Sequence, residues 1–421
     1  MIRYIEINNF KSLVNTKTEL GNLNVFIGNN GAGKSSFFRS LSFLRDLVAN
    51  DSINTALERQ GAKFNDLVTL RASEKSIKFK ARVTTQAIRG DDAPADIDAY
   101  VSISVKKRRF LYVEEEEVTP WDKRGALVDH EGDINKLPYI IYRFRRRMIA
   151  TEQNSRPMTI ENMALAHSFL RDVYSAFVRS RGKRFPLLGS IARSMIRFRH
   201  YEIWGPEALR MPSRLGASTL KPDGSNMAAS LYRMRATGRE AFDSLIEYMQ
   251  KAYPWLHDIE FKQIAHKDYM LSFIEKPSLN AGSKSKKYSA DQVSDGFLRM
   301  LALATLRYSP VNVQTIAYEE PENGLHPRMI TRAGKLLREI SESGVQVLVS
   351  THSPQLISAI FDDIPAEQIK DELKLVQRNS AGETSISSPS LKVLESSVSQ
   401  HISIGDLWSM LLGEKDLQER P

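Results

Sequence analysis

One eight-residue segment, from Gly28 to Ser35, constrains the fold of this chain more than any other. It has the spacing G-x-x-x-x-G-K-[S/T]. The apolar run 23–27 before it predicts a buried strand, and residues 36–44 after it have the apolar spacing of a helix. Glycines between a strand and a helix let backbone N–H groups turn toward an anion, and the helix N-terminus adds partial positive charge. The segment therefore predicts a phosphate-binding P-loop, and the alternative is a glycine-rich turn before an ordinary helix.

The P-loop chemistry assigns roles to its residues. Lys34 would reach the β- and γ-phosphates of a nucleoside triphosphate as a catalytic group, and the Ser35 hydroxyl would bind Mg²⁺. The predicted nucleotide contacts are Asn29, Asn30, Gly31, Ala32, Gly33, Lys34, Ser35 and Ser36.

Two acidic residues follow a second predicted strand, at 311–318. Glu319 and Glu320 would lie at the carboxyl edge of a parallel sheet, where α/β proteins bind ligands. Glu319 is placed to hold Mg²⁺, and Glu320 to orient or deprotonate the attacking water. Because two adjacent buried acids are costly without a cation, a bound metal–nucleotide complex would offset them. The alternative is an acidic cap at a helix N-terminus.

A histidine follows the next predicted strand, at 345–350. His352 would contact the γ-phosphate or the water and so report whether the triphosphate is intact, although a lone histidine is often structural. A predicted helix at 328–343 lies between the two strands. This strand–helix–strand order is what a parallel nucleotide-binding sheet requires.

The length and composition of the chain limit the classes of protein to which it can belong. The 421 residues suggest two or three sub-domains, and 42% apolar with 26% charged residues is typical of a globular protein. There is no cysteine, no apolar run of ~20 residues and no signal peptide, so we expect a cytoplasmic protein without disulfides or thiolate metal sites.

The net charge of +9 is concentrated in one region. Residues 131–200 hold 14 Lys and Arg against 5 Asp and Glu. Such a region can bind nucleic acid or an acidic protein partner, or it can be a solvated helical face. Its clustered cations are Arg143, Arg145, Arg146, Arg147, Arg179, Arg181, Lys183, Arg184, Arg193, Arg197 and Arg199.

The periodicity predicts an α/β fold: a P-loop NTPase with a mixed central sheet, an antiparallel β lobe and a helical insertion. Residues 1–130 would hold the P-loop and the β lobe, with strands at 1–7, 76–83 and 100–105. Residues 131–250 would be a mainly helical basic insertion, including a helix at 159–178, and residues 251–421 would complete the nucleotide-binding part. The run Glu114–Glu117 is expected to be a solvated strand edge rather than a metal site.

Together these motifs resemble the ABC-type ATPase heads of the SMC/RecF class. The nearest likeness is to stand-alone AAA-family ATPases related to OLD-family proteins: segments 319–327 and 350–354 resemble their Walker B, D-loop and switch-histidine motifs, and 220–226 resembles a loop before their signature. The segment after His352 has no D-x-D run, so the likeness does not extend to a TOPRIM nuclease domain. Position 319 is Glu where most ABC ATPases have Asp, and Gln60 and Gln86 are both candidates for the Q-loop.

The resemblance implies ATP and Mg²⁺ as cofactors and a homodimer or higher homo-oligomer. Val293–Arg299 is similar to the signature that touches the ATP of a neighbouring subunit, so Ser294 and Gly296 are expected to contact nucleotide across the interface, with Asn323 beside them. The implied function is an ATP-hydrolysing sensor or motor that acts with a separately encoded effector, such as a nuclease or toxin, in prokaryotic antiviral defence. The alternative is a RecF-like repair ATPase that binds DNA directly. No membrane partner is expected.

Overall fold

The computed structural model groups the chain into two compact units. Unit 1 holds residues 1–21, 28–198 and 374–388, and unit 2 holds 22–27, 199–373 and 389–421. The three-part division at 130 and 250 therefore remains a prediction. The residues that the structure describes are 1–70, 75–87, 95–108, 111–121, 139–143, 148–151, 158–160, 166–203, 205–216, 219–276, 285–309, 313–399 and 402–407.

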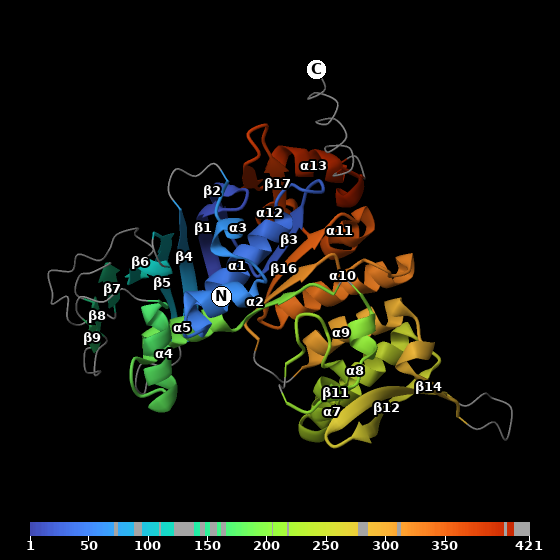
Figure 1. The fold of residues 1–421 in the computed structure, drawn as a ribbon. Coiled ribbons are helices and arrows are strands. Elements are labelled where there is room, and N and C mark those ends of the chain that lie inside the picture. The colour runs from blue at the N-terminus through green and yellow to red at the C-terminus, as the bar shows by residue number, and fades with distance from the viewer. Residues whose placement is uncertain are drawn as a thin grey trace. The chain divides into compact units, whose positions relative to one another are not determined.

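Unit 1 contains an eight-stranded antiparallel sheet (Figure 1). The strands predicted at 1–7, 76–83 and 100–105 are confirmed as β1, β4 and β5. Apolar residues at alternate positions face inward, so Ile5 and Ile7 of β1 are fully buried. In spatial order the strands are β2 (Leu13–Glu19), β1 (Ile2–Phe10), β4 (Ser76–Ala87), β5 (Ala95–Lys107), β6 (Leu111–Trp121), β7 (Tyr139–Arg143), β8 (Met148–Thr151) and β9 (Met158–Ile160).

The helices of unit 1 gather around α1. This helix covers Lys34–Ala49, and its buried face includes Phe37, Phe38 and Leu41. Both α4 (Phe169–Arg179) and α5 (Pro186–Ile196) contact α1, and α5 also contacts β4. The two helices of the basic region therefore belong to the same unit as the P-loop. The remaining elements are α2 (Ile53–Arg59), α3 (Phe64–Leu67) and a hairpin of β17 (Leu373–Arg378) and β18 (Thr384–Ser387), with β18 beside β2.

In the first part of the expected helical insertion, the segments that the structure describes are strands. Strands β7, β8 and β9 extend the antiparallel sheet from β6, and α4 begins only at Phe169. These short segments form strands because the edge of β6 offers them backbone hydrogen-bond partners. The local spacing of apolar residues does not reveal that edge. The apolar spacing of the helix predicted at 159–178 places Leu165, Phe169, Val173 and Phe177 along one buried stripe. Phe169 and Val173 are fully buried, Phe177 is half-buried, and Leu165 lies outside the described residues.

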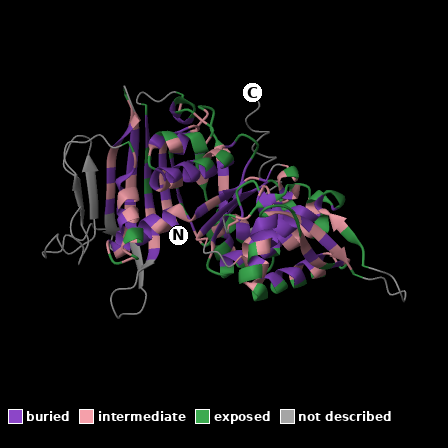
Figure 2. Cartoon of the chain, turned by 60° about the horizontal axis from the view of Figure 1, so that its bottom comes forward, coloured by how far each residue is buried: buried purple, intermediate pink, exposed green. Residues whose placement is uncertain are grey.

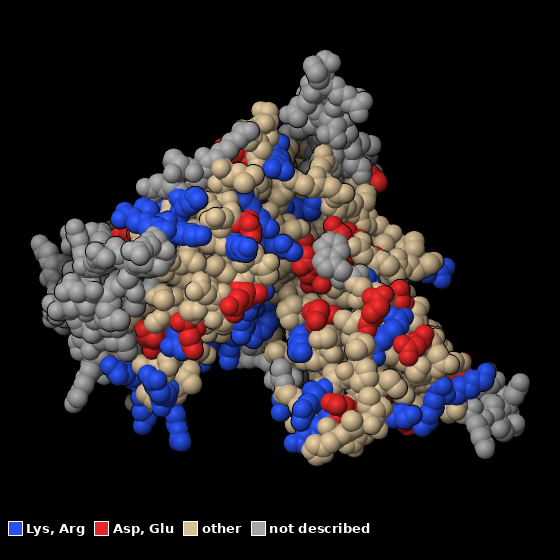
Figure 3. Space-filling view, viewed as in Figure 1, with Lys and Arg blue, Asp and Glu red and all other residues tan. Residues whose placement is uncertain are grey.

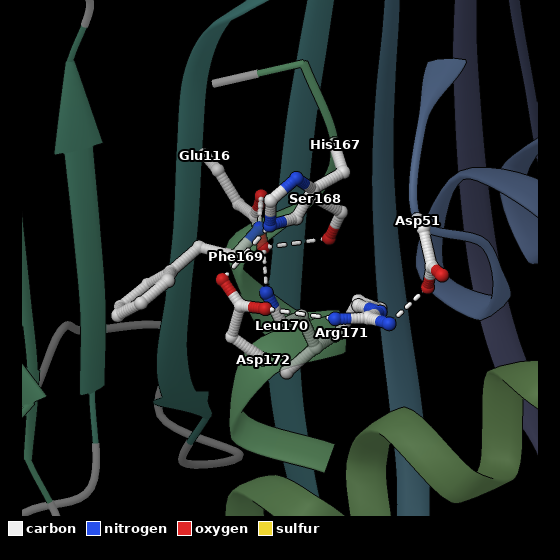
Figure 4. Close-up of polar contacts among 8 residues, drawn as sticks. All are labelled: Asp51, Glu116, His167, Ser168, Phe169, Leu170, Arg171 and Asp172. Atoms are coloured by element: carbon white, nitrogen blue, oxygen red, sulfur yellow. Dashed lines mark hydrogen bonds and ion pairs between the residues drawn. The ribbon is translucent and has the colours of Figure 1, made fainter. Parts of the chain in front are cut away.

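The expectation of a solvated edge at Glu114–Glu117 is wrong for one residue. Glu116 has no exposed surface and accepts three hydrogen bonds at the start of α4 (Figure 4). Its donors are Ser168 Oγ at 3.0 Å, Phe169 N at 2.8 Å and Leu170 N at 2.7 Å. Strand alternation turns Glu116 toward the interior, where the helix start supplies the N–H groups that a buried carboxylate needs. Beside it, Arg171 pairs with both Asp172 and Asp51.

Unit 2 is built on neighbouring sheet strands in the order β10, β15, β16, β3. β15 pairs in parallel with β16, and β16 with β3, as the sequence predicts. All five residues of β15, all six of β16 and all five of β3 are buried, as expected of strands covered on both faces. The strands are β10 (Phe198–Tyr201), β15 (Thr315–Glu319), β16 (Gln346–Thr351) and β3 (Leu23–Ile27).

The rest of unit 2 comprises helices and a small antiparallel sheet. In each unit the buried residues follow the strands and the inner helix faces (Figure 2). The second sheet contains β11 (Ser213–Arg214), β13 (Asp268–Glu275), β12 (Leu256–Ala265) and β14 (Lys287–Ser289). The helices are α6 (Glu207–Arg210), α7 (Met227–Thr237), α8 (Arg239–Ala252), the 3-10 turn Ala290–Gln292, α9 (Asp295–Tyr308), α10 (Pro327–Glu342), α11 (Pro354–Phe361), α12 (Ala366–Glu372) and α13 (Leu391–Ser399).

Within the described part of the chain, no helix has the length and apolar character needed to cross a membrane.

Candidate nucleotide and metal site

The P-loop belongs to unit 1 and follows in the chain directly after β3 ends at Ile27. Asn29, Asn30 and Gly31 are exposed, and a turn closes where Ala32 N donates to Asn29 O over 3.1 Å. Helix α1 then starts at Lys34, with Gly33 as its N-cap and no side chain capping it. The N-terminal N–H groups and the positive end of the helix dipole are therefore presented at the loop, as phosphate binding requires.

Two glycines fit this loop to the β17–β18 hairpin. A Cβ on Gly28 would lie 2.1 Å from Val376 O, and one on Gly33 would lie 2.2 Å from Thr384 Oγ1. Gly33 also has a φ of 114°, which side chains strongly disfavour. Thr384 Oγ1 donates to Ala32 O over 2.8 Å. Thr384 thus braces the loop from 352 residues away, and no sequence motif indicated it.

The Lys34 side chain lies along the inside of the loop. The residue is only 6% exposed, and its Nζ donates to Gly28 O at 2.7 Å and to Asn29 O at 3.2 Å. Ser35 is exposed and Ser36 half-buried, in the first turn of α1. Lys34 is therefore held within the P-loop, and the Ser35 side chain lies on the surface at the helix start.

Unit 2 brings the acidic pair and the histidine to one end of its parallel sheet. Glu319 is the last residue of β15 and pairs with Ser350 of β16. Glu320 follows with a φ of 46°, a left-handed conformation for a residue with a side chain, and its N donates to Ser350 O over 2.9 Å. Strain of this kind clusters at functional sites.

Glu320 lies between Asn323 and His352. Asn323 Nδ2 donates to Glu320 Oε2 over 2.7 Å, and His352 Nε2 lies 3.6 Å from Glu320 Oε1. The side chains of Glu320 and His352 are 27% and 33% exposed, so both remain open to solvent. The structure thus brings three of the predicted site residues together, with Asn323 and His352 on either side of the Glu320 carboxylate.

Glu322 is a fourth member of this group, which sequence reasoning missed. Its Oε1 accepts from Thr351 Oγ1 at 2.5 Å and from His352 N at 3.0 Å. Burial raises the pKa of Glu322, and the two hydrogen bonds oppose that shift. Glu322 therefore ties the loop after β15 to the residue that carries the candidate sensor imidazole. The only feature of the sequence that pointed to Glu322 was its position within the motif 319–327.

Glu319 has two partners that the sequence did not indicate. His200 Nε2 lies 2.8 Å from Glu319 Oε1, and both residues are more than nine-tenths buried. Donor atoms of His200, Glu202 and Glu319 all lie within 4.8 Å of one another. Because His200 precedes Glu319 by 119 residues, only the pairing of β10 beside β15 brings them together.

The signature segment begins α9 in the same unit. Ser294 is exposed and caps its own helix, since its Oγ accepts from Phe297 N at 3.3 Å. A Cβ on Gly296 would lie 2.8 Å from Gly324 O, so the glycine lets α9 approach the loop that carries Glu320 and Asn323. The expected contact of Ser294 and Gly296 with a neighbouring subunit's nucleotide remains a prediction. Gln60 donates to Asp46 over 2.9 Å, and the side chain of Gln86 lies outside the described residues.

Comparisons with known proteins agree with the motifs. Residues 1–120 match the family described as an AAA ATPase domain, and residues 210–358 match the family described as "AAA domain, putative AbiEii toxin, Type IV TA system". The first match contains the P-loop, and the second contains the signature, Glu319, Glu320 and His352. A search of curated proteins finds no match.

Solved structures with a similar fold include two SMC heads. The SMC head domain from Thermotoga maritima is 12% identical, with a TM-score of 0.42 over 92% of this chain and 99% of its own. The SMC head bound to the C-terminal winged-helix domain of ScpA is 15% identical, with a TM-score of 0.45 over 93% of this chain and 98% of its own. Residues 1–120 and 210–358 thus each resemble an AAA ATPase domain, and these two segments carry the nucleotide motifs of the chain.

Proposed function

We propose that this ATPase dimerises around ATP and acts as a sensor or motor for a separately encoded effector. The observation that carries the proposal is the placement of Glu320, which has a strained backbone and lies between Asn323 and His352. A carboxylate next to a metal-ligand candidate and open to solvent is suited to orient a water molecule for attack.

Each motif then has one task in hydrolysis. Asn29 to Ser36 would hold the phosphates, with Lys34 on the β- and γ-phosphates. Ser35 and Glu319 would bind Mg²⁺, which supplies charge neutralisation on the phosphate oxygens. Glu320 would orient and deprotonate the water. His352 would respond to the γ-phosphate, and Glu322 would fix the position of His352.

Ser294, Gly296 and Asn323 would serve the ATP held by a second copy. ATP at a hundred times its dissociation constant stabilises the state that binds it by about 2.7 kcal/mol, enough to favour the closed dimer. Hydrolysis would remove that stabilisation and reopen it. The match of residues 210–358 to a family described as "AAA domain, putative AbiEii toxin, Type IV TA system" supports a role in prokaryotic defence. In this proposal the effector is encoded on another chain.

The test compares two variants of the ATPase. Glu320→Gln should bind ATP, hydrolyse it at least about a hundredfold more slowly and accumulate as an ATP-bound dimer. Lys34→Ala should lose ATP binding and stay monomeric. Mass in solution with and without ATP is read by light scattering after size exclusion, with exposed Glu367→Gln as the control. A Glu320→Gln protein that binds ATP and remains monomeric would contradict the proposal.

A second candidate function, direct DNA binding, is favoured by the surface of α4 and α5. Arg179, Arg181 and Lys183 are exposed there, and Figure 3 shows cations gathered where Figure 1 places α4. Burial and the neighbouring charge of Arg193 lower the pKa of Arg197, which shows that cations lie close together on this surface. Arg145, Arg146 and Arg147, and the side chain of Arg143, lie outside the described residues.

Charge reversal tests this candidate. Replacing Arg179, Arg181 and Lys183 together by Glu should weaken DNA binding and flatten its dependence on salt, since each phosphate contact contributes to the salt slope. Unchanged affinity in the triple variant would exclude these residues as the DNA surface. Reversal of Arg239 and Lys251, which are exposed on α8, is the matched control.

A further inference from the structure

The cluster of His200, Glu202 and Glu319 has a donor set that the proposed hydrolysis does not require. It combines one imidazole with two carboxylates, and it is the one group of three possible metal ligands found among the described residues. Glu319 is 7% exposed and His200 is 8% exposed, while Glu202 is half-buried. Two carboxylates in such a position are costly unless a cation or donors compensate them.

The distances fit the coordination shell of one ion. Ligands about 2.1 Å from an octahedral ion lie about 3 Å apart when they are adjacent and about 4.2 Å apart when they are opposite. His200 Nε2 and Glu319 Oε1 are 2.8 Å apart, and all three donor atoms lie within 4.8 Å of one another. The three side chains can therefore bind a common ion with little movement.

The backbone around the cluster is held from several sides. Tyr201 lies between the two ligands of its segment, and its ring stacks on that of Tyr318 at 6.1 Å, next to Glu319. Glu202 N donates to Pro222 O at 3.2 Å, and Arg299 Nη1 donates to Ile203 O at 2.6 Å. The ligand-bearing segments β10 and β15 are thus fixed relative to one another before any ion binds.

Pro222, whose carbonyl accepts the hydrogen bond from Glu202 N, lies in a loop that the Asn226 side chain closes. Asn226 accepts from Lys221 N at 2.7 Å and donates to Thr219 O at 2.9 Å. Gly224, at a φ of 75°, has no room for a Cβ, which would lie 2.2 Å from Leu209 Cδ2. The segment 220–226 therefore supports the chain at Glu202.

We propose that His200, Glu202 and Glu319 form a binding site for a divalent first-row transition ion. Magnesium prefers oxygen ligands, whereas an imidazole suits first-row transition ions. Mn²⁺ also accepts carboxylates, and it is the paramagnetic ion of this series that we use as the probe. This inference shares one residue with the proposed function, because Glu319 is also the candidate Mg²⁺ ligand in ATP hydrolysis, and it rests on the proposed function in that respect alone. Mn²⁺ would bind without nucleotide, and the ATPase would then work with Mn²⁺ at lower metal concentration than with Mg²⁺.

The experiment titrates Mn²⁺ into the full chain without nucleotide and counts free Mn²⁺ by electron paramagnetic resonance. One ion should bind per chain, and pulsed spectra of the bound ion should show coupling to a directly ligated imidazole ¹⁴N. His200→Ala should abolish the ¹⁴N coupling and weaken binding by at least about tenfold, and Glu202→Gln should weaken binding while the coupling remains. His266→Ala, in the exposed turn after β12, is the control and should change neither.

The outcomes separate this site from the proposed function. Bound Mn²⁺ without ¹⁴N coupling, or no bound Mn²⁺, would overturn the site even if ATP-driven dimers form. Mn²⁺ bound through His200 in a protein that neither binds ATP nor dimerises would keep the site and remove the proposed function. Because His200 is buried, the unfolding temperature of each variant is compared with the parent, and Glu202→Gln tests the site through a half-buried residue if His200→Ala does not fold.

Discussion

His352 Nε2 lies 3.6 Å from Glu320 Oε1, and the two residues come from the ends of neighbouring parallel strands. The separation is longer than a good hydrogen bond, so each side chain retains capacity for a further partner. Glu320 is constrained on its other side by Asn323, and His352 by the contact of its backbone with Glu322. Asn323 and Glu322 therefore fix the positions of Glu320 and His352, respectively.

Loss of the Asn323 amide should slow hydrolysis more than it weakens ATP binding. Asn323→Ala removes the 2.7 Å bond that holds Glu320 Oε2, at a cost of about 1.4 kcal/mol in the barrier, or about tenfold in kcat. Steady-state kinetics against ATP concentration measure the effect. Asn379→Ala, an exposed amide on the other unit, is the control. An unchanged kcat would show that Glu320 needs no such support.

Removal of Glu322 should impair both stability and turnover. Glu322→Ala leaves Thr351 Oγ1 and His352 N without their acceptor, which costs about 1–3 kcal/mol. Glu322→Gln retains an acceptor oxygen and should restore most of kcat and of the unfolding temperature. If Gln fails to rescue kcat while it restores stability, the charge of Glu322 acts in catalysis and the residue does more than position His352.

Gly28 should tolerate no side chain. Gly28→Ala would place a Cβ 2.1 Å from Val376 O, so either the loop or the β17–β18 hairpin must move. We expect loss of ATP binding, measured with a fluorescent ATP analogue, and a lower unfolding temperature. Gly61→Ala is the control: its φ is 58° but nothing lies within 4 Å, so it should cost only about 1 kcal/mol and leave ATP binding unchanged.

The stability of the protein should fall as pH rises through the titration of Glu116. Burial raises the pKa of Glu116 from 4.5 to about 7, against three hydrogen bonds that lower it. Between these values the folded state binds more protons than the unfolded state, so the free energy of unfolding decreases with pH. At about 1.4 kcal/mol per pH unit, the decrease is up to about 3 kcal/mol.

Replacement of Glu116 by Gln should flatten this pH dependence. Denaturant unfolding of the parent and of Glu116→Gln is compared at about pH 5 and about pH 8, with Glu117→Gln on the other face of β6 as the control. The free energy of unfolding could instead change equally with pH in the parent and in Glu116→Gln. That result would mean that the three donors at the start of α4 keep the Glu116 carboxylate ionised over the whole pH range.

The local motifs were predictable because each depends on neighbours in the chain. The P-loop turn needs its own glycines and the helix that follows, and the spacing of Gly28, Gly33 and Lys34 records both. The strands that end at Glu319 and Thr351 are buried on both faces, so their continuous apolar runs identified them. The positions of Glu319, Glu320 and His352 at one sheet edge followed from parallel pairing alone.

The partners of these residues were decided by tertiary structure. Thr384 reaches the P-loop through the β17–β18 hairpin, and Glu116 is buried because α4 starts beside β6. Likewise, β10 beside β15 brings His200 and Glu202 to Glu319. Sequence spacing specifies contacts within a turn, a helix or a strand, whereas contacts between residues 53 or more apart, as here, depend on which edges pair and which faces pack. The sequence by itself therefore determined the nucleotide motifs, and the tertiary structure decided what surrounds them.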